Sequence, residues 1–126
     1  MANKNVLTLK DILNRKEYFK NKNKETRELY IKRLDANIVI SKPDIALCSD
    51  IADMDNNHDT NKYFMYEIVV EPNLKDSKLH EEFGVADPVD IIDEIFDPGE
   101  VNIICTEGMK FAGFYDGVEV VEDLKN

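Results

Sequence analysis

The sequence predicts a small α+β domain that is mostly helical, with one N-terminal β-hairpin and about five to seven short helices. Two patterns predict this class. A β-branched run at residues 38–40 follows an alternating segment across a turn. Apolar residues recur at helical spacing along most of the remaining chain. Because 126 residues can bury one core but not two, we expect a single domain.

Charge divides the chain into a basic start and an acidic remainder. Residues 1–33 hold ten Lys/Arg and four Asp/Glu, a net +6, whereas residues 34–126 hold six and 22, a net −16. The acidic part would repel nucleic-acid phosphates, so no nucleic-acid partner is expected. This asymmetry favours head-to-tail self-association or docking on a basic partner.

The predicted organisation has three parts. Residues 1–26 form a basic N-terminal helix and linker, residues 27–43 the hairpin, and residues 44–126 an acidic helical body. Thr8 is placed as the N-cap of the first helix, with Asp11 three residues later as in a capping box. Apolar side chains then recur at helical spacing to about Lys20: Leu9, Ile12, Leu13 and Phe19.

The hairpin is predicted from alternation and turn chemistry. Leu29 and Ile31 alternate with polar or amphipathic residues, and the β-branched run follows. We expect a tight turn at Asp35–Asn37, and Pro43 should end the second strand.

Helical spacing resumes after the hairpin. A helix is predicted from Asp44, and a polar loop from residue 53. The segment "KYFMYEIVV", residues 62–70, is compatible with either a buried helix or a buried strand, ended by Pro72. Ser77 is predicted to cap a short helix that Gly84 stops.

The segment "DPVDIIDEIFDPGEV", residues 87–101, holds two Asp-Pro steps. Asp is a favoured N-cap, and Pro is favoured at the first helical position. An acid follows each cap after three residues, Asp90 and Glu100. We therefore interpret the segment as two helix starts rather than as a catalytic carboxylate array. Gly113 should close the second helix, and residues 116–126 are predicted to form a last short helix.

The metal-binding candidates are weak. Asp53, Asp55, Asn57 and Asp59 have the spacing of a calcium loop. However, His58 occupies the position that requires Gly, and Phe64 the position that requires Glu. No clustered His/Cys pattern for zinc is present. We therefore predict neither a metal site nor a cofactor.

Catalytic signatures are also missing from the sequence. It has no Gly-rich phosphate loop, and Cys105 lies on an apolar helical face without a neighbouring His. Asp93 and Glu94 are adjacent, so a helix directs them apart. We predict a protein that is not an enzyme.

The compartment follows from two further patterns. No apolar run approaches the roughly 20 residues of a membrane span, and the first residues lack a signal-peptide pattern. We expect a cytoplasmic protein without a membrane partner. Cys48 and Cys105 are expected as free thiols inside the fold.

Residues 91–114 contain more large apolar side chains than a small core requires. The surplus is either core or a surface that is buried against a partner or another copy. The predicted partner contacts are Ile95, Phe96, Ile103, Ile104 and Phe111.

Several segments together resemble the XkdN-like phage tail assembly chaperones of tailed phages, prophages and phage-tail-like particles of Gram-positive bacteria. These segments are "LTLKDIL", "LYIKRL", "YEIVVEPNLKD", "DPVDIIDEIFDPGEV" and "VEDLKN", in the same order over nearly the whole chain. The span from Tyr66 to Glu100 is the most specific.

The resemblance implies a non-enzymatic chaperone that binds and solubilises the tape measure protein during tail assembly. It also implies self-association, a helical residue 62–70 segment, absence from the mature particle, and the tail tube protein as a further partner through a frameshifted product. A different hypothesis, from the −16 net charge, is a small acidic inhibitor or immunity-type protein that binds a basic partner. Salt sensitivity of partner binding distinguishes the two.

Overall fold

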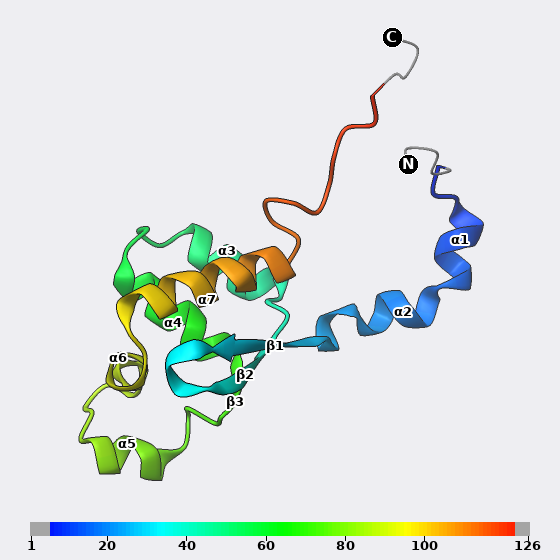
Figure 1. Cartoon of the computed structure of the whole chain (residues 1–126). Coiled ribbons are helices and arrows are strands. Elements are labelled where there is room, and N and C mark those ends of the chain that lie inside the picture. Colours follow the sequence, from blue (N-terminus) through cyan, green and yellow to red (C-terminus); the bar gives the residue numbers. More distant parts are fainter. Residues whose placement is uncertain (1–5, 123–126) are drawn as a thin grey trace.

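The computed structural model describes residues 6–122 and confirms the α+β class. Its described residues contain seven α-helices and one three-stranded antiparallel sheet in the order β1-β2-β3. Helices α4 and α7 pack beside this sheet, and the N-terminal helices extend away from it (Figure 1). The strands are β1 (Thr26–Ile31), β2 (Ala36–Ser41) and β3 (Val69–Glu71). The helices are α1 (Leu9–Asn14), α2 (Lys16–Asn21), α3 (Ile45–Ala52), α4 (His58–Ile68), α5 (Ser77–Phe83), α6 (Ile91–Ile95) and α7 (Pro98–Phe111).

The hairpin of β1 and β2 pairs from Thr26 opposite Ser41 to Ile31 opposite Ala36. Its connection begins earlier than predicted, with a 3-10 turn at Lys32–Leu34 followed by Asp35 at φ 48°. The predicted turn extended to Asn37, but that residue is already paired within β2.

The ambiguous residues 62–70 are mostly helical. Helix α4 continues to Ile68, and the chain then enters β3, which pairs with β2. Asn57 caps α4, because its side-chain oxygen accepts a hydrogen bond from the Thr60 N–H at 3.0 Å. The sequence therefore predicted the helix through the family resemblance and missed the short strand.

The N-terminal segment begins as predicted and then differs. Thr8 and Asp11 form the capping box of α1. The helix breaks at Arg15, which has φ −110° and ψ 25°, so two six-residue helices replace the predicted single one. Neither helix buries a residue. The segment from Val6 to Lys24 is called the N-terminal arm below.

The later helix boundaries also test local capping rules. Asp76, rather than the predicted Ser77, caps α5 by accepting from the N–H groups of Lys78 and Leu79 at 2.8 and 3.1 Å. Gly84 ends that helix at φ 65°, as predicted.

Both Asp-Pro steps start helical structure, as predicted. Asp87 precedes a 3-10 turn (Pro88–Asp90) that runs into α6. Asp97 precedes α7, where the Asp97 N–H donates to Glu100 Oε1 at 2.8 Å in a capping box. The chain leaves α7 with Gly113 at φ 95°. The predicted last helix is wrong for residues 116–122, which form neither helix nor strand, and its remainder lies outside the described residues.

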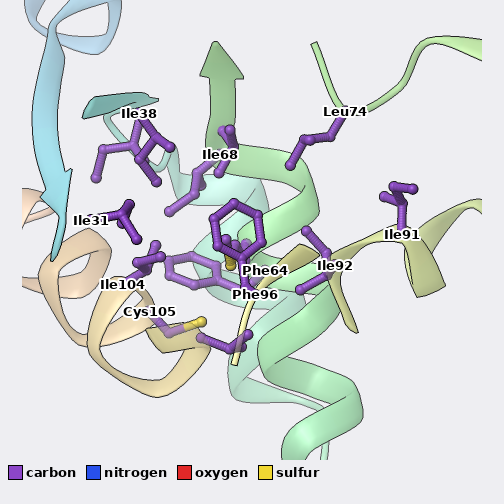
Figure 2. Packing of buried hydrophobic residues seen from close by; sticks show 14 of the residues in the cluster. Ile31, Ile38, Phe64, Ile68, Leu74, Ile91, Ile92, Phe96, Ile104 and Cys105 are labelled. Carbon is purple, nitrogen blue, oxygen red and sulfur yellow. The ribbon is translucent and has the colours of Figure 1, made fainter. Parts of the chain in front are cut away.

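The core lies between the sheet and the helices α4, α6 and α7. Figure 2 shows Phe96 and Ile104 directed into the same cluster as Phe64 and Ile38. Helices α4 and α7 approach closely at Gly108, where an added Cβ would lie 2.7 Å from Ile68 Cδ1. A buried glycine therefore sets the spacing of these two helices.

Candidate functional site

The carboxylates of residues 87–100 are held by two cations from other parts of the chain. The first is Arg33, at the end of the hairpin. Its Nε and Nη2 donate to Glu100 Oε2 and Oε1 at 3.0 and 2.9 Å. Nη2 also donates to the Ile95 backbone oxygen at 2.7 Å, and Nε lies 3.2 Å from Asp97 Oδ2. The Arg33 hydrogen bonds lower the pKa of Glu100, so its carboxylate stays ionised.

The second cation is Lys62 on α4, a buried residue. Its Nζ lies 2.7 Å from Asp90 Oδ1 and 3.0 Å from Asp93 Oδ2. The hydrogen bond to Asp90 raises the pKa of Lys62. Burial opposes ionisation of Asp93, but hydrogen bonds from His58 and Lys62 outweigh it, and the pKa of Asp93 is lowered.

These ion pairs give the acidic segment a structural role. Four of its carboxylates lie within 3.2 Å of Arg33 or Lys62, and the pairs join the hairpin and α4 to the segment that contains α6 and the start of α7: Asp90, Asp93, Asp97 and Glu100. Among residues 6–122, no group of three or more His, Cys, Asp or Glu side chains is arranged to hold a metal ion. The loop residues with calcium-like spacing are included in that statement.

The cysteines lie in different environments. Cys105 is buried, and its Sγ donates to the Asn61 backbone oxygen at 3.2 Å. Burial raises the pKa of Cys105 to about 12, so the thiol stays protonated and is a poor nucleophile. Cys48 is half-buried, and burial also raises its pKa.

Within the described residues, none of the helices is both long and apolar enough to cross a bilayer.

A groove of about 540 Å³ runs between the edge strand β1 and helix α7, and it is the best candidate for a binding surface. Leu29 and Ile31 line it from β1, and Ile103 and Ile104 line it from α7. The lining also includes five charged residues: Lys32, Arg33, Asp97, Glu100 and Glu107. We call this feature the β1–α7 groove. Its lining combines aliphatic and charged side chains, as docking sites for amphipathic segments do.

The structure separates the five residues predicted to contact a partner. Phe96, Ile104 and Phe111 are only 4%, 2% and 7% exposed, so they belong to the core. Ile95 is half-buried and packs against that core. Ile103 is 63% exposed and stands at the groove. The partner contacts remain a prediction. Of the five side chains, only the exposed Ile103 and the half-buried Ile95 are accessible to a partner in this fold.

Three features of this site were missed from the sequence. The β1 wall of the groove, Leu29 and Ile31, was interpreted only as one side of a hairpin. Arg33 and Lys62 pair with acids far along the chain, which no local pattern reveals. A charged residue at the start of the apolar run 62–70 was the one available signal, because a lysine beside buried residues needs an anionic partner.

One comparison with known proteins identifies a family for this chain. A family model described as the phage XkdN-like tail assembly chaperone protein matches residues 8–125. No curated protein and no solved structure matches the chain. The family match includes the capping box at Thr8, the hairpin, both Asp-Pro steps and the groove. The chain therefore belongs to the XkdN-like family of phage tail assembly chaperones.

Proposed function

We propose that this chaperone binds the tape measure protein in the cytoplasm, keeps it soluble while the tail is assembled, and is absent from the finished particle. It does so without catalysis. Membership of a tail assembly chaperone family supports a role in tail assembly. The family resemblance implies that the client is the tape measure protein. A tape measure protein consists mainly of long amphipathic helix, so it exposes apolar surface that a chaperone can cover.

The observation that carries the proposal is the exposed Ile103 in the β1–α7 groove. A side chain of that size is 63% exposed beside Leu29 and Ile31, which form an aliphatic floor. An amphipathic client helix can place its apolar residues on this floor and its polar residues beside the charged lining residues. Burial of aliphatic surface contributes about 25 cal/mol per Å², which gives an affinity that salt does not screen.

The charge of the chain suits a soluble carrier. The net charge of −10 favours the solubility of the chaperone and of complexes that contain it. The β1–α7 groove then provides the apolar contacts, and the net negative charge of the chain provides solubility.

The test is co-expression of the chaperone with the tape measure protein of the same tail, followed by co-purification in about 0.1 M and about 1 M salt. We expect the complex to survive high salt and the tape measure protein to be insoluble alone. Ile103→Asp should abolish solubilisation. Asn102→Asp is the matched control, because it adds the same charge at an exposed α7 position outside the groove.

Each contrary outcome has a defined meaning. If folded Ile103→Asp still solubilises the client, the groove is not the binding site. If the complex forms only in low salt and Ile103→Asp does not change it, binding is electrostatic. The hypothesis of an acidic protein that docks on a basic partner then replaces apolar docking. If no complex forms in either salt, the tape measure protein is not the client.

A further inference from the structure

The segment that follows α7 carries valines that the described fold leaves uncovered. Val118, Val120 and Val121 are 94%, 87% and 74% exposed, and residues 115–122 form neither helix nor strand. We call residues 115–122 the tail. The family match includes the tail, since it extends to residue 125. Because valine is favoured in extended structure, the tail is suited to lie as an extended strap on another surface.

A second uncovered surface lies where the tail begins. Ile45, the first residue of α3, is 81% exposed, and Phe114, just before the tail, is 44% exposed. Both line one cavity of about 490 Å³, together with the half-buried Cys48. We call this cavity the α3 pocket. Since Phe114 is one of its lining residues, the tail starts at the border of the pocket.

The tail and the α3 pocket have opposite charges. Residues 115–122 hold three acids and no cation, a net −3. The charged lining residues of the pocket are two lysines and one acid: Lys22, Lys42 and Asp44. The Asp44 carboxylate already accepts from a backbone N–H as the cap of α3, and Lys42 has Glu25 at 3.6 Å. The exposed Lys22 is therefore the lysine best placed to pair with an acid of the tail.

The alternation of side chains along the tail fits this pocket. In an extended chain successive side chains point to opposite sides, so Val118, Val120 and Glu122 share one side, and Val121 lies on the other. The first side presents two valines followed by a carboxylate, and the pocket presents apolar side chains beside lysines. Val120 is six residues after Phe114, a reach of up to about 20 Å, so it can turn back over the pocket.

A tight turn fixes the place from which the tail starts. The Phe114 N–H donates to the Met109 oxygen at 3.0 Å, and Gly113 has φ 95°. A Cβ at Gly117 would lie 2.6 Å from the Gly113 oxygen, so the two glycine backbones are in close contact. Figure 1 shows the chain running outward beyond this turn. Rotation at Gly117, whose backbone carries no side chain, redirects the valines and leaves the turn in place.

We propose that the tail closes as a strap over the α3 pocket of its own chain. Val118 and Val120 then cover Ile45, and Glu122 lies beside Lys22. The outward tail is the open arrangement, and the two arrangements exchange because the burial of a few apolar side chains is offset by the ordering of the chain. Closure also ties the N-terminal arm to the body, since Lys22 belongs to the base of the arm. The inference involves no client and does not rest on the proposed function.

The first test measures how fast iodoacetamide alkylates Cys48 in the full chain. Mass spectrometry of the modified peptides separates Cys48 from the buried Cys105. A closed tail covers Cys48, and the rate follows the open fraction, so Val120→Asp should speed alkylation at least about threefold. Val121→Asp adds the same charge on the opposite side of the tail and should react like the wild type. Negative charge near a thiol disfavours the thiolate, so electrostatics alone would give the opposite change.

The second test uses Cys48 as the native partner of a disulfide. Val120→Cys should form a disulfide within one molecule at least about threefold faster than Val121→Cys, because only the first side chain faces the pocket. The two tethers differ in length by a single residue. Both positions are exposed, so the fold should be kept, which circular dichroism checks. Non-reducing electrophoresis and intact mass distinguish a bond within one chain from a bond between two.

Exchange of two charges tests the pairing of the tail with the arm. Lys22→Glu should speed the alkylation of Cys48, because it removes the cation beside Glu122. Glu122→Lys in the same chain should restore the protection, since opposite charges face each other again. A double variant that stays unprotected would overturn the pairing, and the proposal with it.

The other contrary outcomes are equally defined. The proposal is overturned if Val120→Asp leaves the alkylation rate of Cys48 unchanged. Equal rates of disulfide formation for Val120→Cys and Val121→Cys would show that the tail is a free tether, which also overturns it. Disulfides that form only between two molecules would place the tail on a neighbouring copy and would overturn closure within one chain.

Discussion

Arg33 binds Glu100 with two hydrogen bonds, from Nε to Oε2 at 3.0 Å and from Nη2 to Oε1 at 2.9 Å. Glu100 Oε1 also accepts from the Asp97 N–H, which makes the acid the shared member of an ion pair and a capping box. The same guanidinium donates to the Ile95 oxygen. One side chain of the hairpin connection therefore fixes the junction between α6 and α7.

Replacing Arg33 should loosen this junction. We expect Arg33→Ala to lower the melting temperature and to speed amide hydrogen exchange in the first turn of α7. Arg33→Lys should recover only part of the loss, because an ammonium cannot reproduce the two-pronged contact with a carboxylate. Lys32→Ala is the control at the adjacent exposed position. Equal effects of Arg33→Ala and Lys32→Ala would show that the Glu100 contact contributes nothing specific.

Lys62 should contribute more to stability than an ordinary surface lysine. Its side chain is 11% exposed and contacts Asp90 and Asp93, which are half exposed and can be rehydrated. We expect Lys62→Ala to lower the free energy of unfolding by about 1–2 kcal/mol, less than for a fully buried pair. Lys75→Ala, which removes an exposed partner of Glu67 at 3.6 Å, should change it by less than about 0.5 kcal/mol. Urea denaturation of both variants measures the difference.

Asp93 should make part of the stability depend on pH. Its carboxyl pKa is lower in the folded protein than the ordinary value of 3.8, so ionisation favours folding. This contribution is complete above 3.8 and is lost as the pH falls through the lower folded value. Asp93→Asn should therefore destabilise the protein at about pH 6, and the difference from the wild type should shrink at about pH 3.

Urea denaturation at the two pH values tests this expectation, with Glu94→Gln as the control at the neighbouring exposed acid. A difference between wild type and Asp93→Asn that is the same at both pH values would contradict the assigned ionisation.

Gly108 should resist substitution although it lies inside a helix. Gly→Ala usually stabilises a helix interior by about 0.5–1 kcal/mol. Here the new Cβ would lie 2.7 Å from Ile68 Cδ1 and 3.0 Å from Phe64 Cε2, two side chains that are themselves buried. We expect Gly108→Ala to lower the free energy of unfolding by about 1–2 kcal/mol. Gly99→Ala, with nothing within 4 Å of its Cβ, should cause no loss. A stabilised Gly108→Ala would show that α4 and α7 can move apart.

The sequence predicted the structure wherever one local rule was sufficient. The capping box at Thr8 and the helix starts at Asp87 and Asp97 depend on residues within three positions of one another, and all three formed. At Asp76 two capping residues stood side by side, and the local pattern alone could not decide between them. The prediction of a last helix was wrong for a related reason. The valines of this segment are compatible with either a helix or a strand, and residues 118–122 are exposed, so no packing against the core selects one of them.

The candidate site was predicted less well because it depends on distant contacts. Helical periodicity placed Phe96 and Ile104 on apolar faces, but a periodic pattern does not reveal whether a face meets the core or a partner. The sheet and α4 bury both residues and leave Ile103 outside. Likewise, Lys62 and Arg33 acquire their roles only when segments far apart in the sequence meet.

The distribution of charge around residues 87–100 has a consequence for the order in which the chain folds. This stretch contains six acidic residues and no basic one, so the repulsion between its carboxylates opposes its compaction when it is alone. Both cations that hold it, Arg33 and Lys62, come earlier in the sequence. During synthesis from the N-terminus, the hairpin and α4 therefore leave the ribosome first, and the acidic stretch meets its counter-charges as soon as it emerges.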